Sequence, residues 1–189
     1  MTKLRLSILY PLAVVLAGCA GETPPPPVDV APPDAKPSAI AAAVSRVNIF
    51  DERVNIADPE RSLHMPQTGI VGKEYDLTPA LSGADRDLIE REVRGHFVDG
   101  ERVVEVDVYI MMGKQGFAVG EMKEALRLDF AIRIEVADQT DVDDVITAEG
   151  SASLSRQAVH LDRDSVPGLY AQTIHEGVKN AFQKIYSQH

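Results

Sequence analysis

One histidine–glutamate pair is the first place in this sequence where hydrolytic chemistry could occur. His175 and Glu176 stand together in a stretch with helical spacing of apolar residues. A helical zinc-protease site needs a second histidine four residues after the first, so that both imidazoles share one face of the helix. Lys179 occupies that position. The sequence therefore predicts no zinc site here, and we expect His175 to be an ordinary helix-surface residue.

A group of carboxylates is the second candidate for chemistry. Asp138, Asp141, Asp143 and Asp144 lie close together in a segment typical of a turn. Calcium binds carboxylates, but a calcium loop also needs a glycine and a bidentate glutamate at fixed spacings. Both are missing, so we expect a solvated turn.

Phosphate-binding and nucleophile motifs are absent as well. Gly113-Lys114 is not preceded by the glycine of a phosphate-binding loop and is followed by Gln115. The sequence has no Gly-x-Ser-x-Gly turn. The serines at alternate positions of 151–155 have no evident histidine partner. We therefore predict a protein that is not an enzyme, with no cofactor and no bound metal.

Composition excludes further classes. The 189 residues include 19 Lys or Arg and 29 Asp or Glu, for a formal net charge of −10. A nucleic-acid-binding protein needs a basic face to neutralise phosphates, so we expect no nucleic-acid partner. The single cysteine rules out an intramolecular disulfide and a Cys-x-x-Cys redox pair.

That cysteine lies in the segment with the sharpest signal. Lys3 and Arg5 precede the apolar run Leu6 to Ala17, which is shorter than the roughly 20 residues of a membrane-spanning helix. A positive start and a short apolar run are typical of a secretory signal peptide. The run ends in Leu16-Ala17-Gly18-Cys19, which resembles the bacterial lipobox.

The resemblance to a lipobox implies an anchor and a location. Signal peptidase II would cut between Gly18 and Cys19, and Cys19 would carry a diacylglyceryl group and an N-acyl chain. Several acyl chains hold a protein on a membrane far more firmly than one. Residue 20 is Ala rather than the Asp of inner-membrane retention. We therefore expect a lipid anchor in the outer membrane, with the rest of the chain facing the periplasm.

The remaining chain divides into a tether and one domain. Residues 19–39 hold seven of the twelve prolines and little that could pack, which predicts a stiff polyproline-like spacer. Residues 40–189 are long enough for one compact periplasmic domain. The expected organisation is a signal peptide at 1–18, a lipidated tether at 19–39 and a domain at 40–189.

Alternating apolar residues predict the strands of this domain. Residues 122–136 place apolar side chains at even positions and charged ones at most odd positions, as in a strand with one buried face. The ranges 103–112 and 145–158 alternate in the same way, and 44–50 gives a shorter strand. In 103–112 the residues expected to face the core include Met112.

Two helices complete the expected fold. The sequence Ser82-x-x-Asp85 resembles a capping box, and Gly95 is a plausible end for the helix that follows. A second helix begins near Asp164 or Ser165, and its apolar residues recur every three or four positions to Ile185. The order β-α-β-β-β-α predicts an α+β fold, a four-stranded sheet with both helices on one face.

Opposite charges suggest a register for the two hairpins. A turn around 115–120 places Asp107 opposite Arg127. A turn around 138–144 places Arg133 opposite Glu149. Such cross-strand ion pairs stabilise a sheet modestly, by about 0.2–1 kcal/mol each.

Two unusual features indicate where a partner could bind. The connection 51–81 is long, and long connections are usually functional or carry structure of their own. It includes Arg53 and Arg61. Tyr109 and Met111 put apolar groups on the polar face of the expected sheet, close to Phe117. We predict that these five residues contact a partner. The alternative is that the long connection folds over the apolar ones.

The whole pattern resembles a class of small envelope lipoproteins. The class includes YajG-like lipoproteins, auxiliary lipoproteins of ABC-type lipid transport, and the lipoprotein plug of the lipopolysaccharide translocon. The YajG-like comparison uses Val47 to Arg53, followed by a glycine-bearing loop and a helix. The resemblance implies a non-enzymatic accessory or assembly subunit of a cell-envelope complex, acting in lipid or lipopolysaccharide transport. Its expected partners are the membrane, through Cys19, and an envelope protein or a lipid.

Two alternative functions remain open. One is a lipid-binding carrier, which requires an apolar cavity under Leu128, Phe130, Ile174 and Phe182. The other is a regulator of a cell-wall synthase, reached through the proline-rich tether.

Overall fold

A computed structural model describes residues 39–57, 71–141 and 144–188. The expected signal peptide, the lipobox-like segment and nearly all of the expected tether lie outside these residues. The described chain forms five strands and two helices, with a short 3-10 turn at Arg163–Ser165. The bounds are β1 (Ile40–Asp51), β2 (Glu74–Leu77), α1 (Gly83–Gly95), β3 (Phe97–Val119), β4 (Glu124–Asp138), β5 (Val145–Ala158) and α2 (Val166–Tyr186).

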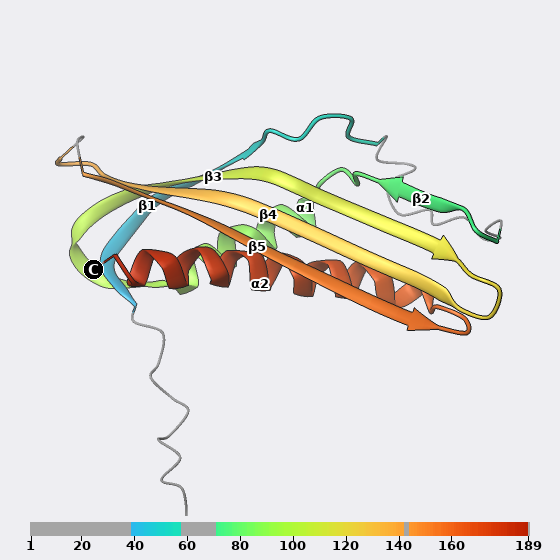
Figure 1. The fold of residues 1–189 in the computed structure, drawn as a ribbon. Coiled ribbons are helices and arrows are strands. Elements are labelled where there is room, and N and C mark those ends of the chain that lie inside the picture. The colour runs from blue at the N-terminus through green and yellow to red at the C-terminus, as the bar shows by residue number, and fades with distance from the viewer. Residues whose placement is uncertain (1–38, 58–70, 142–143, 189) are drawn as a thin grey trace, which may run out of the picture. The chain divides into compact units, whose positions relative to one another are not determined.

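The strands form one mixed sheet, and both helices lie on the same side of it (Figure 1). The order is β1-β3-β4-β5, with β1 parallel to β3 and the other pairs antiparallel. The short strand β2 pairs with the last part of β3, beyond the residues that pair with β1. The expected α+β class is confirmed. The expected count of four strands is wrong, because β2 forms within the long connection between β1 and α1.

The core fills the layer between the sheet and the helices. The even positions of β4 from Leu126 to Val136 are buried, as their alternation predicts. From the helix side, α2 contributes residues such as Ile174 and Phe182, both fully buried. Met122 is an exception to the predicted pattern, because it is 81% exposed in the turn before β4.

A β-bulge divides β3 into two parts: even-numbered residues face the core before it, and odd-numbered residues face the core after it. Pairing with β4 shifts by one residue between Ile110 and Met112. Even residues from Val104 to Ile110 are buried before the shift, whereas Gly113, Gln115 and Phe117 are buried after it. An extra residue in one strand reverses which side chains face the core. Met112 is therefore only partly buried. Phe117, which the sequence placed in a turn after this strand, lies within β3 with its side chain in the core.

One of the two predicted registers is confirmed. Arg133 pairs with Glu149, as expected. Asp107 pairs with Glu135 rather than Arg127, which lies opposite Gly116. The β3–β4 turn is closed by a hydrogen bond from the Gly120 amide to the Lys123 carbonyl, later in the chain than the sequence suggested.

Helix caps fix the ends of α1. The Ser82 side chain accepts a hydrogen bond from the Asp85 amide, and the Asp85 side chain accepts one from the Ser82 amide. This is the predicted capping box, and it satisfies two backbone donors that the helix itself cannot pair. α2 begins next to Pro167, whose missing amide hydrogen is not needed in the first turn.

Each outer strand of the sheet receives hydrogen bonds from the helix beside it. On α1, Arg94 donates to the Val44 carbonyl at 3.1 Å and Arg86 to the Ile49 carbonyl at 3.4 Å. On α2, Asn180 donates to the Ser151 carbonyl at 2.8 Å. Side chains that occupy backbone acceptors of an edge strand make it less available to other chains.

Candidate functional site

A row of four side chains crosses the sheet on the face away from the helices. Phe50 pairs with Tyr109, Tyr109 with Arg133 and Arg133 with Glu149, on four adjacent strands. The rings of Phe50 and Tyr109 stack, with centroids 5.1 Å apart and planes 21° apart. The Arg133 guanidinium carbon lies 4.3 Å from the centre of the Tyr109 ring. We call these four residues the outer-face row.

Charged neighbours hold the arginine of this row in place. Arg133 lies 3.1 Å from a Glu135 oxygen and 3.7 Å from a Glu52 oxygen. A guanidinium over an aromatic face adds a cation–π attraction of about 0.5–1 kcal/mol at an exposed site. Desolvation and the negative charges of Glu135 and Asp107 raise the pKa of Tyr109 above its usual value. The row is therefore a pre-arranged surface with an aromatic end and a charged end.

Apolar area is exposed at the aromatic end. Phe50 is 43% exposed and Met111 is 42% exposed. Met111 lies at the bulge, two residues after Tyr109 on β3. Further along the same face, Asn48 donates hydrogen bonds to Glu105 at 2.6 Å and to Asp107 at 2.7 Å. The exposed apolar side chains are thus bordered by polar groups, which is the composition expected of a protein-binding patch.

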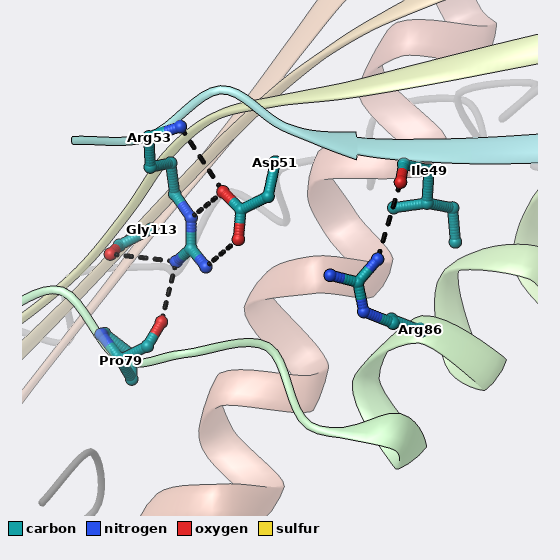
Figure 2. A network of polar contacts seen from close by, with 6 residues as sticks. All are labelled: Ile49, Asp51, Arg53, Pro79, Arg86 and Gly113. Atoms are coloured by element: carbon teal, nitrogen blue, oxygen red, sulfur yellow. Dashed lines mark hydrogen bonds and ion pairs between the residues drawn. The ribbon is translucent and has the colours of Figure 1, made fainter. Parts of the chain in front are cut away.

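Arg53 belongs to a different, buried arrangement (Figure 2). Its guanidinium donates to both Asp51 oxygens at 2.7 Å each and to the Pro79 carbonyl at 2.9 Å. A longer contact of 3.5 Å reaches the Gly113 carbonyl. Burial works against the charges of both groups, but their mutual hydrogen bonds and attraction outweigh it. As a result, the pKa of Asp51 is lowered and that of Arg53 is raised.

The cluster around Arg53 connects segments that are far apart in sequence. A Cβ placed on Gly113 would lie 2.5 Å from the Arg53 Nη1 and 2.6 Å from the Tyr170 hydroxyl, so both side chains approach the β3 backbone closely. Burial raises the pKa of Tyr170 to about 12. The cluster joins the end of β1, the segment before α1, the middle of β3 and α2. We call it the Arg53 clamp; it comprises Asp51, Arg53, Pro79, Gly113 and Tyr170.

A shallow groove of about 490 Å³ lies on the outer face beyond the bulge. Its walls carry both signs of charge: Glu74 and Asp76 from β2, Lys114 from β3, and Arg127 and Asp129 from β4. Arg127 and Asp129 pair at 2.8 Å. The groove has polar walls and an open mouth, and its lining residues do not form a nucleophile–base pair.

The residues singled out from the sequence separate into three groups. Tyr109 and Met111 lie together on the outer face, as expected. Arg53 and Phe117 are 8% and 3% exposed, so neither side chain is presented to a partner. Gly18, Cys19 and Arg61 lie outside the described residues.

Sequence reasoning named one member of the outer-face row, Tyr109, as a site residue and missed the other three, Phe50, Arg133 and Glu149. Phe50 sits at the end of a strand whose parallel pairing with β3 has no local signature. Arg133 could have been placed beside Tyr109 only with the correct β3–β4 register. Its predicted partner, Glu149, was the usable signal.

The candidates for metal and acid–base chemistry have structural partners instead. His175 lies 2.7 Å from Glu92, linking the two helices. Asp138 accepts hydrogen bonds from Thr140 and from Arg102, which hold its pKa below the usual range. Within residues 39–57, 71–141 and 144–188, no three His, Cys, Asp or Glu side chains are arranged to hold a metal ion.

The place proposed for a carried lipid is filled by protein. Leu128, Phe130, Ile174 and Phe182 are all fully buried in one core. A Cβ on Gly177 would lie 2.8 Å from the Phe130 ring, which shows how closely α2 packs on β4. A lipid at this position would have to displace core side chains. The apolar cavity that the carrier alternative requires at this place is therefore not supported.

In the described part of the chain, neither helix is long and apolar enough to cross a membrane.

Comparison with known proteins adds a distant likeness of fold. No protein-family model matches the sequence, and no curated protein matches it. One similar solved structure is a proposed lipoprotein from Caulobacter crescentus, at 11% identity and a TM-score of 0.37, over 58% of this chain and 83% of that one. Another is a DUF330 protein from Xanthomonas campestris, at 13% identity and a TM-score of 0.43, over 83% of this chain and 94% of that one.

Proposed function

We propose that this protein is a lipoprotein anchored in the outer membrane, whose periplasmic domain acts as a non-enzymatic accessory or assembly subunit of an envelope complex. Lipid or lipopolysaccharide transport is the process that it would assist. In this proposal, the outer-face row together with Met111 is the surface that binds the protein partner.

The observation that carries the proposal is the exposed pair Phe50 and Met111 beside Tyr109. A sheet face directed at water needs no aromatic stack, and this is the place on the outer face where an aromatic pair, an exposed methionine and an arginine gather. Aromatic and arginine side chains dominate the binding energy of most protein interfaces, especially when they are pre-ordered. Tyr109 and Arg133 are already held by Phe50, Glu135 and Glu52, so little side-chain freedom would be lost on binding.

The anchor is supported by the sequence. Leu16-Ala17-Gly18-Cys19 follows a short apolar run at the usual distance from the first residue, and Cys19 is the sole cysteine. Labelling cells with an alkyne fatty acid tests this part. The wild-type protein should become labelled and Cys19→Ser should not. Equal labelling of both proteins would refute lipidation at Cys19.

The binding surface is tested by photo-crosslinking in cells. A photoreactive amino acid at Met111 should yield a distinct crosslinked product with an envelope protein, identifiable by mass spectrometry. Val98 is a matched control position, because it is apolar, lies on the same strand and is 50% exposed. A product that depends on Met111 and is lost in Tyr109→Ala supports the proposal. Equal products from Val98 and Met111, or none from Met111, would overturn it.

A further inference from the structure

The hydrogen bonding of the sheet determines which backbone groups β5 presents at its free edge. The hydrogen bond between Gly120 and Lys123 shows that the backbone groups of Lys123 point toward β3. Since alternate residues of a strand point to opposite sides, the odd residues of β4 are the ones bonded to β3. The even residues of β4 therefore bond to β5, and through the regular β4–β5 register they bond to even residues of β5. The odd residues of β5 must direct their amide and carbonyl groups away from the sheet.

Helix α2 and Gln188, which follows it, occupy this edge over only part of its length. Asn180 donates to the Ser151 carbonyl at 2.8 Å, and Gln188 reaches the Thr147 carbonyl at 3.5 Å. Both acceptors are odd residues, which agrees with the bonding pattern above. For Ser153, Ser155 and Gln157, the described residues provide no partner for the outward backbone groups. We call Ser153–Gln157 the open edge.

The open edge also lacks the usual devices that block strand addition. β5 pairs with β4 without a bulge from Val145 to Ala158. It contains no proline and no lysine, and Arg156 is the sole charged residue of the open edge. Natural edge strands are commonly protected by such residues or by bulges. A regular, nearly uncharged edge is suited to pairing with another strand.

We propose that the open edge pairs with the same segment of a second copy of this chain, antiparallel about Ser155. A two-fold axis through Ser155 places Ser155 opposite its equivalent and Ser153 opposite Gln157 of the second copy. By symmetry, Gln157 then lies opposite Ser153 of the second copy, which makes three pairs. All of these residues have outward backbone groups, so the three pairs would form about six hydrogen bonds, two for each pair. The two sheets would then form one continuous sheet.

Charge, together with the side-chain hydrogen bonds that already occupy part of the β5 edge, favours this register over its neighbours. Pairing about Ser155 places Arg156 opposite Leu154, so no like charges meet. Pairing about Glu149 would set two carboxylates against each other, which destabilises a sheet. Pairing about Ser151 would displace Asn180 from the Ser151 carbonyl. The self-complementary segment is therefore the one that α2 leaves uncovered. This inference concerns β5 and is independent of the surface proposed for the envelope partner.

Cysteine crosslinking of the full-length protein in membranes tests the register. Ser155→Cys should form a disulfide-linked dimer under mild oxidation, because residues opposite each other in an antiparallel pair lie about 5.5 Å apart at Cα. Thr147→Cys, on the capped part of the same strand, is the matched control and should stay monomeric. The unmodified chain, with Cys19 alone, gives the background. No Ser155-dependent dimer, equal dimer from Thr147, or a crosslink from Ser155 to a different protein would overturn the proposal.

A proline at the same position gives a second, independent measurement. The Ser155 amide points outward, so Ser155→Pro removes no bond to β4 and should leave the fold intact. Native mass spectrometry of the detergent-extracted chain should detect a dimer for the wild type and at least a tenfold smaller dimer fraction for Ser155→Pro. Circular dichroism checks that the variant is folded. A wild-type protein that stays monomeric, or a folded Ser155→Pro that dimerises as well as the wild type, would contradict the inference.

Discussion

The guanidinium of Arg53 and the carboxylate of Asp51 are joined by two hydrogen bonds of 2.7 Å each, although the residues are only two positions apart. The Arg53 side chain is 2% exposed and the Asp51 side chain is 14% exposed. Parallel bonds of this kind are the strongest form of ion pair between side chains. Because Arg53 also donates to the Pro79 carbonyl, the pair fixes the segment that leads into α1.

Removing one member of this pair should destabilise the domain strongly. Asp51→Asn leaves the Arg53 cation buried without its counter-charge, which typically costs about 3–5 kcal/mol. Urea unfolding followed by circular dichroism measures the change in the free energy of unfolding. Asp129→Asn is the matched control, because its partner Arg127 is 70% exposed and such pairs contribute about 0–1 kcal/mol. Equal effects of the two variants would show that the Arg53 clamp has no special stabilising role.

Gly113 is expected to tolerate no side chain. In Gly113→Ala the new Cβ would lie 2.5 Å from Arg53 Nη1 and 2.6 Å from the Tyr170 hydroxyl, so the clamp must shift. Overpacking of this kind destabilises by about 1–3 kcal/mol. Gly83→Ala, in the first turn of α1 with no atom near the new Cβ, should be neutral or slightly stabilising. Thermal unfolding of the two variants compares them, and a neutral Gly113→Ala would show that the clamp is loosely packed.

Tyr170 should make stability fall at alkaline pH. Burial raises the pKa of its phenol to about 12 from 10.0, so the folded chain retains a proton that the unfolded chain loses. The contribution is fully present below pH 10 and decreases as the pH rises from 10 towards 12. Tyr170→Phe should therefore flatten the dependence of the unfolding free energy on pH above pH 10.

Ultraviolet absorbance at 295 nm provides the direct check on Tyr170. In the folded wild type, one phenol should ionise near pH 12, and this step should be missing in Tyr170→Phe. If the difference between the two titration curves falls near pH 10, the phenol is not buried in solution.

Because of the bulge, truncating Phe117 should lower the free energy of unfolding much more than truncating Met111, although both positions are odd-numbered. Phe117→Ala removes a buried ring that is 3% exposed and should cost about 3–5 kcal/mol. Met111→Ala removes a side chain that is 42% exposed and should change stability by less than about 0.5 kcal/mol. Denaturant unfolding measures the loss of unfolding free energy in each variant. A strand without a bulge would place positions 111 and 117 on the same face, and the two losses would then be similar.

Features set by local pattern were predictable from the sequence. β5 has the predicted bounds, Val145–Ala158, because regular alternation continues over its whole length. The capping box before α1 was visible in Ser82 and Asp85, since its geometry depends on residues three positions apart. The buried face of β4 followed from period-two spacing.

Features set by distant pairing were not predictable in the same way. β2 has four residues, Glu74–Leu77, and is a strand only because β3 extends far enough to pair with it. The bulge beside Met111 has no signature in residue type, yet it determines that the Phe117 side chain faces the core, where the sequence had suggested a turn. Arg53 looked like a surface cation because its counter-ion, Asp51, and the backbone carbonyls around it become neighbours only in the folded chain.

The parallel pairing of β1 with β3 has a consequence for the time at which this domain can fold. Phe50 pairs with Tyr109, 59 residues later in the chain. During synthesis or export, the first strand must therefore wait for α1 and half of β3 before it finds its place, whereas β3, β4 and β5 can pair as consecutive hairpins. Long-range pairings of this kind form slowly compared with local hairpins. β1 should be the last strand to become protected in pulse-labelling hydrogen exchange, although it is the first to be made.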